Sequence, residues 1–551
     1  MNHGNPDLPE QPGPTGLPGP TGQPGPTGQP GEPARPGPSG AAALPRRGFL
    51  GLAGAAAFGA VAGCAPGAGQ QSGAPRPGGR LRAVFPGGGA DEVLDPHLTD
   101  LYSEIARAKA LFDKLADYGS DMSPQPRLAE RWEASPDLRT WRITLRQAAF
   151  HDGRPVRAAD VLFSYARILR PDSTRRAKAS LSVVDLPNSR ALDDRTVEFR
   201  LTRPYAEFPN AMATLGAYIV PEGTEDFARP VGSGPFRFTS FEPGRSFLAA
   251  RNPDYWDGAP HLDELEILVS NDEAARVNAL LGGQAEYAHD LTATTARSYE
   301  ASGQVHIHRL PLSNFHAFAM KTDRPPFDRP EVRQAFFHLV DREELVRSVL
   351  QGSGQVANDL YGKGYRYYDD SLPQRGPDVA RAKELLRRAG AEDLRVQMLT
   401  SDVSSGLREA ALAFADQARR AGVTVDVVLG DKDTYWSDIS DRGAVVSYRS
   451  GAMPIESHVS QRLLSGSTTN NTKWQRPEFD ALYQQAQSTP DEARRAELYR
   501  AMQRQLYDEG GFCWWGVSDW IVATANQVGG VDDRAPANTL DWARFDRVWL
   551  A

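Results

Sequence analysis

The stretch from Val231 to Ile267 constrains the fold more than any other part of the chain. It reads VGSGPFRF, then a short spacer, then ARNPDYWDGAPHLDELEI. Gly232, Gly234 and Pro235 predict a tight turn, because glycine adopts backbone angles that other residues avoid and proline fixes one of them. Alternating apolar residues predict a strand on either side of Asn252-Pro253-Asp254, which is itself typical of a turn. The stretch therefore predicts the order turn, strand, turn, strand.

The length and the charge of the chain narrow its function class. With 551 residues, the chain is long enough for more than one domain and a large core. The formal net charge of −8 and the lack of a long basic run argue against nucleic acid as a partner. The two cysteines are Cys64 and Cys513, and no internal disulfide is possible if Cys64 carries lipid.

The first part of the chain resembles an export signal. Glycine recurs with a period of three from Gly13 to Gly31, as in collagen, but too few triplets follow for a triple helix. A proline-rich disordered leader is therefore the expectation. Pro45-Arg46-Arg47-Gly48 resembles a twin-arginine export motif, and the apolar run from Phe49 to Gly63 is too short to span a membrane.

Val61-Ala62-Gly63-Cys64 resembles a lipobox, in which a cysteine after small residues receives the lipid. Cleavage before Cys64 would remove residues 1–63 as a signal peptide with its leader. Residues 64–79, rich in Gly, Pro, Gln and Ser, would then be a lipid-anchored flexible tether. The alternative is an ordinary secretory signal with an incidental cysteine. Either way we expect an extracytoplasmic protein, and the lipobox predicts anchoring at the outer face of the cytoplasmic membrane.

From Arg80 onward, apolar residues alternate between the period of a strand and that of a helix, which predicts an α/β protein. Strands are expected at 80–85, 141–145, 197–201, 217–220, 394–399, 423–429, 444–448, 512–515 and 520–523. Helices are expected at 101–115, from 158, and at 273–280, 378–390, 406–421, 475–487 and 491–507.

Several motifs resemble family 5 of the solute-binding proteins of ABC importers, a family that binds peptides, nickel chelates and some sugars. Besides the stretch from Val231, they are LDP at Leu94, PRLAERWEASPDLRTWRITLR at Pro126, AAFHDGRPVRAADVLFSYARIL at Ala148, PFDRPEVRQA at Pro326 and LVDREEL at Leu339. The resemblance runs from about Gly79 to the end of the chain.

This resemblance implies a two-lobed periplasmic-binding-protein-like fold of type II, cluster C. The hinge would be crossed twice, and lobe I would carry an extra subdomain. Lobe I would comprise residues 80–116, 228–313 and 519–551, with the subdomain at 117–227 and lobe II at 314–518. It also implies a monomer that closes on a small solute between its lobes and delivers it to an ABC permease and its ATPase.

The resemblance also points to the solute site. Peptide binders of this family hold the ligand's amino terminus with an Asp three residues after a strand-ending Trp. Here Tyr448 stands at the Trp position and Gly451 at the Asp position, so the expected partner of a buried ammonium is missing. Arg449 instead offers a donor fork suited to a carboxylate or a phosphate.

Three tryptophans are further candidates for solute contact, because indole supplies a large apolar area and one polar group. They are Trp436, Trp514 and Trp515. For each of them, packing in the core is the alternative.

His306 and His308 form a His-x-His pair, which on a strand places both rings on one face and is a plausible metal pair. His316 follows, but no nearby cysteine and no obvious carboxylate completes a site. A solvent-facing strand without metal is therefore the expectation. His151-Asp152 resembles half of a catalytic site, but the sequence around it predicts a turn.

The leading hypothesis is therefore a receptor for a peptide or peptide-like solute, without enzymatic activity and without a cofactor. The sequence has no GxSxG elbow, no HExxH zinc motif and no phosphate-binding loop. An exported hydrolase and a ligand-sensing receptor on the same fold are alternative functions. A nickel chelate or a sugar is the alternative to a peptide.

Overall fold

The computed structural model describes residues 74–99, 101–432, 434–439, 441–534, 536 and 543–551. The leader, the twin-arginine-like motif, Cys64 and most of the expected tether lie outside these residues. The described residues belong to one compact unit, Gly69–Ala551. Within them, no helix has both the length and the apolar character that crossing a membrane requires.

One sheet of eleven strands organises the structure. Its strands follow the order β15-β14-β16-β12-β17-β11-β1-β10-β9-β8, and β13 pairs with β17 beside this path. The strands are β1 (Arg80–Phe85), β8 (Phe236–Glu242), β9 (Ser246–Arg251), β10 (Glu264–Val269), β11 (Tyr287–Ala288), β12 (Val305–Met320), β13 (Gly354–Val356), β14 (Arg395–Thr400), β15 (Thr424–Leu429), β16 (Val445–Gly451) and β17 (Phe512–Ala525).

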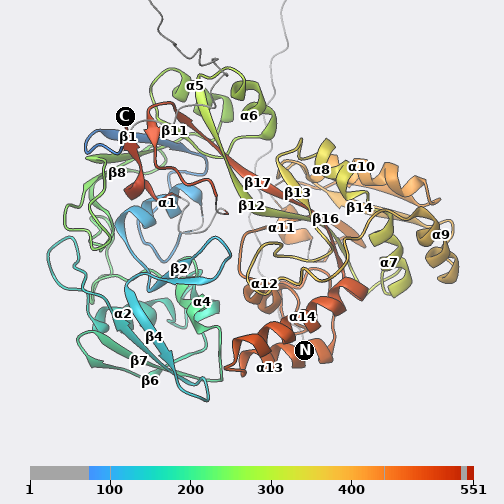
Figure 1. Cartoon of the computed structure of the whole chain (residues 1–551), viewed down its shortest axis with the longest axis horizontal. Coiled ribbons are helices and arrows are strands. Elements are labelled where there is room, and N and C mark those ends of the chain that lie inside the picture. The colour runs from blue at the N-terminus through green and yellow to red at the C-terminus, as the bar shows by residue number, and fades with distance from the viewer. Residues whose placement is uncertain (1–73, 100, 433, 440, 535, 537–542) are drawn as a thin grey trace, which may run out of the picture. The chain divides into compact units, whose positions relative to one another are not determined.

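The long strands β12 and β17 are common to both halves of this sheet (Figure 1). They pair antiparallel, and their register is interrupted between Leu310 and Asn314 of β12. Beyond this break, β16 pairs with the C-terminal part of β12, whereas β11 pairs with the C-terminal part of β17. We call the strands β1 and β8–β11 the β1 half, and the strands β13–β16 the β16 half.

Helices cover both halves. The β1 half carries α1 (Tyr102–Leu111), α5 (Glu273–Leu281) and α6 (Ala293–Glu300). The segments of the β16 half contain α7 (Pro330–Leu339), α8 (Arg342–Ser348), α9 (Val379–Arg388), α10 (Leu407–Arg419), α11 (Tyr435–Asp438), α12 (Ile455–Arg462), α13 (Pro477–Gln487) and α14 (Glu492–Glu509). α9 shows why such segments are helical: Asp378 caps its first turn, Ala382 and Leu385 face the core, and Gly390 follows its end in the left-handed region.

A separate antiparallel sheet, in the order β4-β5-β7-β6, lies between β1 and β8 in the chain. Its strands are β4 (Ala129–Ala134), β5 (Thr140–Leu145), β6 (Val184–Asp193) and β7 (Thr196–Leu201). With it come the short strands β2 (Ala116–Tyr118) and β3 (Pro124–Pro126) and the helices α2 (Ala158–Ile168), α3 (Lys178–Leu181) and α4 (Phe208–Ala213). We call Ala116–Ala213 the small-sheet region. Near the C-terminus, β18 (Val528–Gly529) pairs with β19 (Trp549–Leu550), and a short 3-10 helix spans Phe545–Arg547.

Most of the expected helices and strands are confirmed, but the prediction of one strand is wrong. Residues 217–220 form no strand, because Tyr218 makes only an isolated bridge to Lys114. The two strands expected at 512–515 and 520–523 are parts of the single strand β17. The turn at Asp152-Gly153 is confirmed, with Gly153 in the left-handed region.

The stretch from Val231 requires its glycines for close contact rather than for unusual backbone angles. A Cβ atom on Gly232 would lie 1.8 Å from the carbonyl oxygen of Leu111, at the end of α1. Gly234 approaches the same residue, and its N–H donates to the Leu111 oxygen at 2.9 Å. The ring of His151 bonds this loop through Nε2 to the oxygen of Gly234 at 3.0 Å and accepts from the Gly232 N–H through Nδ1 at 3.2 Å. His151 thus joins two of the sequence motifs.

Gly232→Ala should therefore destabilise the protein, because the added methyl group overlaps backbone that cannot move away. We expect the free energy of unfolding to fall by about 1–3 kcal/mol or more, measured by urea denaturation. Gly376→Ala is the matched control, because a Cβ atom there meets no atom within 4 Å. Equal stability of the two variants would contradict this account of the loop.

Candidate functional site

Aromatic side chains gather on one face of the β16 half. The ring of Tyr448 lies 5.9 Å from that of Trp514 and 5.0 Å from that of Phe512, between centroids. Trp436 of α11 meets Tyr448 edge-on at 6.4 Å and is 42% exposed, whereas Tyr448 and Trp514 are buried. The structure thus brings three of the sequence candidates together: Trp436, Tyr448 and Trp514.

Trp515 lies on the opposite face of β17. Neighbouring side chains of a strand point to opposite sides of the sheet, so Trp514 and Trp515 cannot share a surface. The indole of Trp515 is buried in a second core, where its centroid lies 5.1 Å from the His316 ring and 6.4 Å from the Phe318 ring. This position favours core packing.

Gly451, at the position of the expected Asp, ends β16 and is exposed. Its carbonyl oxygen accepts a hydrogen bond from the Tyr361 hydroxyl at 2.7 Å, and the same hydroxyl accepts from the Met453 N–H at 2.9 Å. Tyr361 stacks on His458, with centroids 4.0 Å apart. The sequence offered no signal for Tyr361, because it belongs to a long loop between β13 and α9.

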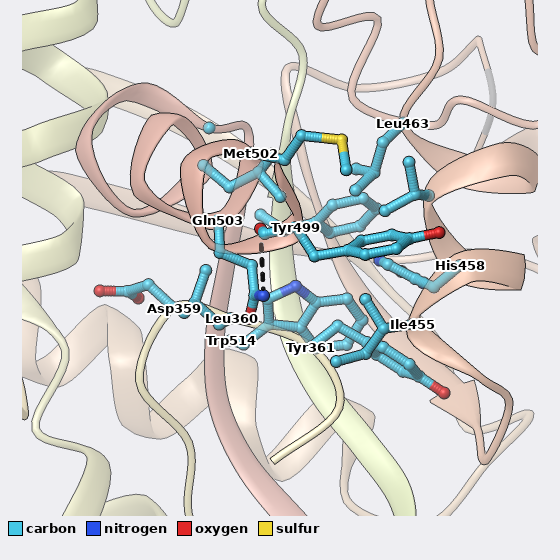
Figure 2. Close-up of a pocket in the computed structure, with 14 residues that line it drawn as sticks. Asp359, Leu360, Tyr361, Ile455, His458, Leu463, Tyr499, Met502, Gln503 and Trp514 are labelled. Atoms are coloured by element: carbon cyan, nitrogen blue, oxygen red, sulfur yellow. Dashed lines mark hydrogen bonds between the residues drawn. The ribbon is translucent and has the colours of Figure 1, made fainter. Parts of the chain in front are cut away.

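A small cavity lies behind this aromatic face. Figure 2 shows side chains of α12, α14 and β17 around it, with His458 and Trp514 among them, together with Tyr361 of the loop between β13 and α9. Both ring nitrogens of His458 lack a partner among the described residues, and burial lowers the pKa of this imidazole well below its usual value, so the ring is neutral. The free volume is about 20 Å³, which accommodates about one water molecule but no peptide. The cavity is therefore not the solute site in this conformation.

Arg449 points to the other face of β16, directly opposite His316 in the pairing of β16 with β12. Arg449 is half-buried, and its guanidinium forms no hydrogen bond or ion pair with the described residues. Burial and the charge of Arg449 lower the pKa of His316 to about 3. This imidazole is therefore neutral and does not repel the neighbouring guanidinium.

Asp290 follows β11 and approaches Arg449 from the β1 half. Burial raises the pKa of its carboxyl group, and the nearby charge of Arg449 acts in the opposite direction. The two side chains do not reach ion-pair distance, and the Asp290 carboxylate has no other partner among the described residues. The charge of Arg449 also lowers the pKa of the Tyr102 hydroxyl, although burial raises it more. A cation and an anion from the two halves of the sheet therefore face a common region without being paired.

Glu456 is a buried acid that sequence reasoning missed. It lies in the first turn of α12, is 2% exposed, and accepts a hydrogen bond from the Tyr483 hydroxyl at 2.7 Å. Burial raises its pKa to about 7, and hydrogen bonds from Tyr483 and from Tyr205 of the small-sheet region only partly offset this effect. No basic side chain in the described part of the chain forms an ion pair with it. The possible signal was an acid five residues after Gly451, at a helix start.

The small-sheet region is joined to the β16 half by a paired acid. Glu207 accepts from Arg366 at 3.0 Å, from Arg495 at 3.1 Å and from the Tyr367 hydroxyl at 2.8 Å. The N–H of Ala206 donates to the oxygen of Gln487 at 2.8 Å. Unlike Glu456, Glu207 is thus fully compensated.

The histidines of β12 correct an expectation. Only His306 is exposed, whereas His308 and His316 are 6% and 3% exposed, so β12 is not a solvent-facing strand at these positions. The cause is the side chains that cover them: His308 lies against Thr524 and Asp533, and His316 lies against Ser518 and Trp515.

Glu456 should make stability depend on pH. Its pKa rises from 4.5 to about 7 on folding, so the folded state binds more protons between these values and loses stability as pH increases. Glu456→Gln removes this loss, and at pH 8 the variant should exceed the wild type by up to about 3 kcal/mol in unfolding free energy. Urea denaturation at pH 5 and pH 8 measures the difference.

Glu478→Gln, at an exposed position of α13, is the control and should leave the pH profile unchanged. A wild-type profile that coincides with that of Glu456→Gln at both pH values would show that Glu456 ionises normally.

Comparison with known proteins identifies the family of this chain. The model of the bacterial extracellular solute-binding proteins, family 5 Middle, matches residues 123–473, more than half of the chain. The peptide transport periplasmic protein SapA of Salmonella typhimurium is 27% identical over 443 residues, which cover 73% of this chain and 80% of SapA.

Solved structures of solute-binding proteins have the same fold. The ABC transporter substrate-binding protein CtaP of Listeria monocytogenes has a TM-score of 0.77 at 23% identity and covers 86% of this chain and 100% of its own. AgaA of A. tumefaciens R10, solved with agropinic acid, has a TM-score of 0.70 at 25% identity, covering 86% of this chain and 99% of its own. The expected α/β, two-lobed periplasmic-binding fold is confirmed, and the chain belongs to family 5 of the bacterial extracellular solute-binding proteins.

Proposed function

We propose that this protein is the solute-binding component of an ABC importer and takes a peptide or peptide-like solute that carries a carboxylate. The observation that carries the proposal is Arg449, a half-buried guanidinium without a partner among the described residues. A guanidinium binds a carboxylate through two parallel hydrogen bonds, which gives both strength and orientation. SapA, a peptide transport protein, and AgaA, a binder of agropinic acid, support this solute class.

Asp290 complements Arg449. A zwitterionic solute could direct its carboxylate to Arg449 and its ammonium group to Asp290. Asp290 would then take the role of the Asp that peptide binders of the family have at the position of Gly451. Each charged group of the protein would then be compensated only when solute is present, and an unpaired buried charge is costly. Tyr448 and Trp514 lie on the opposite face of β16 from Arg449. Together with Trp436 they are therefore candidates only for parts of the solute that extend past Gly451, at the end of β16.

The proposed closing motion uses the register break of β12. The lobes correspond to the two halves of the large sheet, and the crossings are Leu310–Asn314 in β12 and the paired Ser518 in β17. Solute that contacts Arg449 from one lobe and Asp290 from the other favours the closed state, because it interacts with both only there. No turnover of the solute is expected.

The cellular setting is proposed on the sequence. The resemblance to a lipobox points to Cys64 as the lipid attachment site, which would hold the mature protein at the outer face of the cytoplasmic membrane. We propose that it acts there as a monomer. The permease and its ATPase would be its partners. Detection of a diacylglyceryl group on an N-terminal Cys64 by mass spectrometry tests this assignment.

Arg449→Gln tests the solute class. We expect the wild type to bind dipeptides and tripeptides at least tenfold more tightly than the same peptides amidated at the C-terminus, because a paired guanidinium contributes about 1.4 kcal/mol or more. The variant should lose this preference in isothermal titration calorimetry. Agropinic acid is included as a second acidic solute.

Arg442→Gln is the matched control, because Arg442 is exposed and pairs with Asp438 at 3.0 Å. This control should keep the preference. Equal binding of free and amidated peptides by the wild type would reject the proposed role of Arg449, and hydrolysis of the peptides would reject the receptor function itself.

A further inference from the structure

We propose that His306, His308 and Asp533 form a binding site for a divalent transition-metal ion of the zinc type. The ligand atoms that these three residues offer all lie within 4.8 Å of one another. The two histidines come from the N-terminal part of β12, and Asp533 follows β18 near the C-terminus. Asp533 therefore supplies the carboxylate that the sequence near the histidines lacks, and it lies 225 residues after His308 in the chain.

The distances fit ligands around one ion. Nδ1 of His308 and Oδ2 of Asp533 are 3.3 Å apart. Two ligands with bonds of about 2.1 Å to a tetrahedral ion lie about 3.4 Å from each other, whereas a charge-assisted hydrogen bond is about 2.7–2.9 Å long. The ring centroids of His306 and His308 are 4.4 Å apart, so the two imidazoles are direct neighbours.

A hydrogen bond behind the site orients the buried histidine. Nε2 of His308 lies 3.0 Å from the hydroxyl oxygen of Thr524, a fully buried residue of β17. When this nitrogen donates to the hydroxyl, the lone pair of Nδ1 is directed toward Asp533. In this tautomer two acceptors face each other and a cation between them is favourable, whereas in the metal-free protein the other tautomer lets Nδ1 donate to Asp533 at 3.3 Å. Metal-binding histidines typically have a partner such as Thr524 on the second nitrogen.

The site also has an entrance. His306 is exposed and the side chain of Asp533 is 44% exposed, while His308 forms the buried end. Two imidazoles and one carboxylate leave at least one position for water, and this ligand set suits Zn²⁺, Ni²⁺ or Cu²⁺ rather than Mg²⁺ or Ca²⁺. A bound ion would tie the segment after β18 to the part of β12 before the register break, whereas Arg449 pairs with β12 beyond the break.

Zinc titration tests the site. The full chain is purified without a polyhistidine tag, freed of metal with a chelator, and titrated with Zn²⁺ by calorimetry. We expect one equivalent to bind with a Kd in the micromolar range or tighter. Asp533→Asn and His306→Gln should each weaken this binding at least tenfold. At a hundredfold excess of Zn²⁺ over the wild-type Kd, the melting temperature of the wild type should rise by about 2–3 °C, and that of each variant by at most about half as much.

Asp532→Asn is the matched control, because the neighbouring Asp532 pairs with Arg534 and not with a histidine. It should bind Zn²⁺ like the wild type. With Cu²⁺ as the probe, electron paramagnetic resonance should report two imidazole nitrogens in the wild type and one in His306→Gln. Equal Zn²⁺ affinity of wild type and Asp533→Asn, with unchanged circular dichroism spectra, would overturn the proposal.

Discussion

The pairing of β12 with β17 is the contact on which the rest of the structure depends. The two strands have 16 and 14 residues, and every other strand of the large sheet reaches the opposite half only through them. Their register is broken between Leu310 and Asn314, where backbone hydrogen bonding between the strands is interrupted. The hinge that we propose lies at this interruption, where both strands pass from one half to the other. The same pairing fixes the Arg449 region, because Arg449 lies beside β12 and Asp290 follows the strand that lies beside β17.

The buried charged side chains fall into two groups: those with an ionic partner and those without one among the described residues. Glu207 receives hydrogen bonds from two arginines and a tyrosine, and such a cluster stabilises the contact between the small-sheet region and the β16 half. Arg449, Asp290 and Glu456 are buried or half-buried without an ionic partner among the described residues. Unpaired buried charge is expensive, so a protein retains it where a ligand or a proton completes it. The difference separates Glu207, which joins two parts of the fold, from Arg449 and Asp290, to which we assign the solute in our proposal, and from Glu456, which a proton neutralises.

The sequence predicted the fold well, because hydrophobic periodicity is local. β1, β5, β7, β14, β15 and β16 lie where alternation was seen, and the glycine stretch at Val231 packs as a compact unit against α1. Residues 217–220 were misjudged, since an apolar run that is buried without a neighbouring strand has the same pattern as one that is paired. For the site, the sequence could name Tyr448 and Trp514 but could not separate Trp514 from Trp515, which requires knowing the faces of β17. It could not find Glu456, Asp290 or Asp533, because their significance arises from neighbours distant in the chain.

The two parts of β12 illustrate how one strand serves two chemistries. Side chains two residues apart share a face, so His306 and His308 project together on the N-terminal part, beside the fully buried Thr524 of β17. Beyond the register break, His316 is held by Ser518 at 2.9 Å and is kept neutral under the charge of Arg449. The hinge that we propose lies at this break, and an ion held at the first part would contact only the side of the sheet that carries the β1 half. Metal binding would therefore stiffen that half without opposing closure at the second part, and the two sites can coexist on one strand.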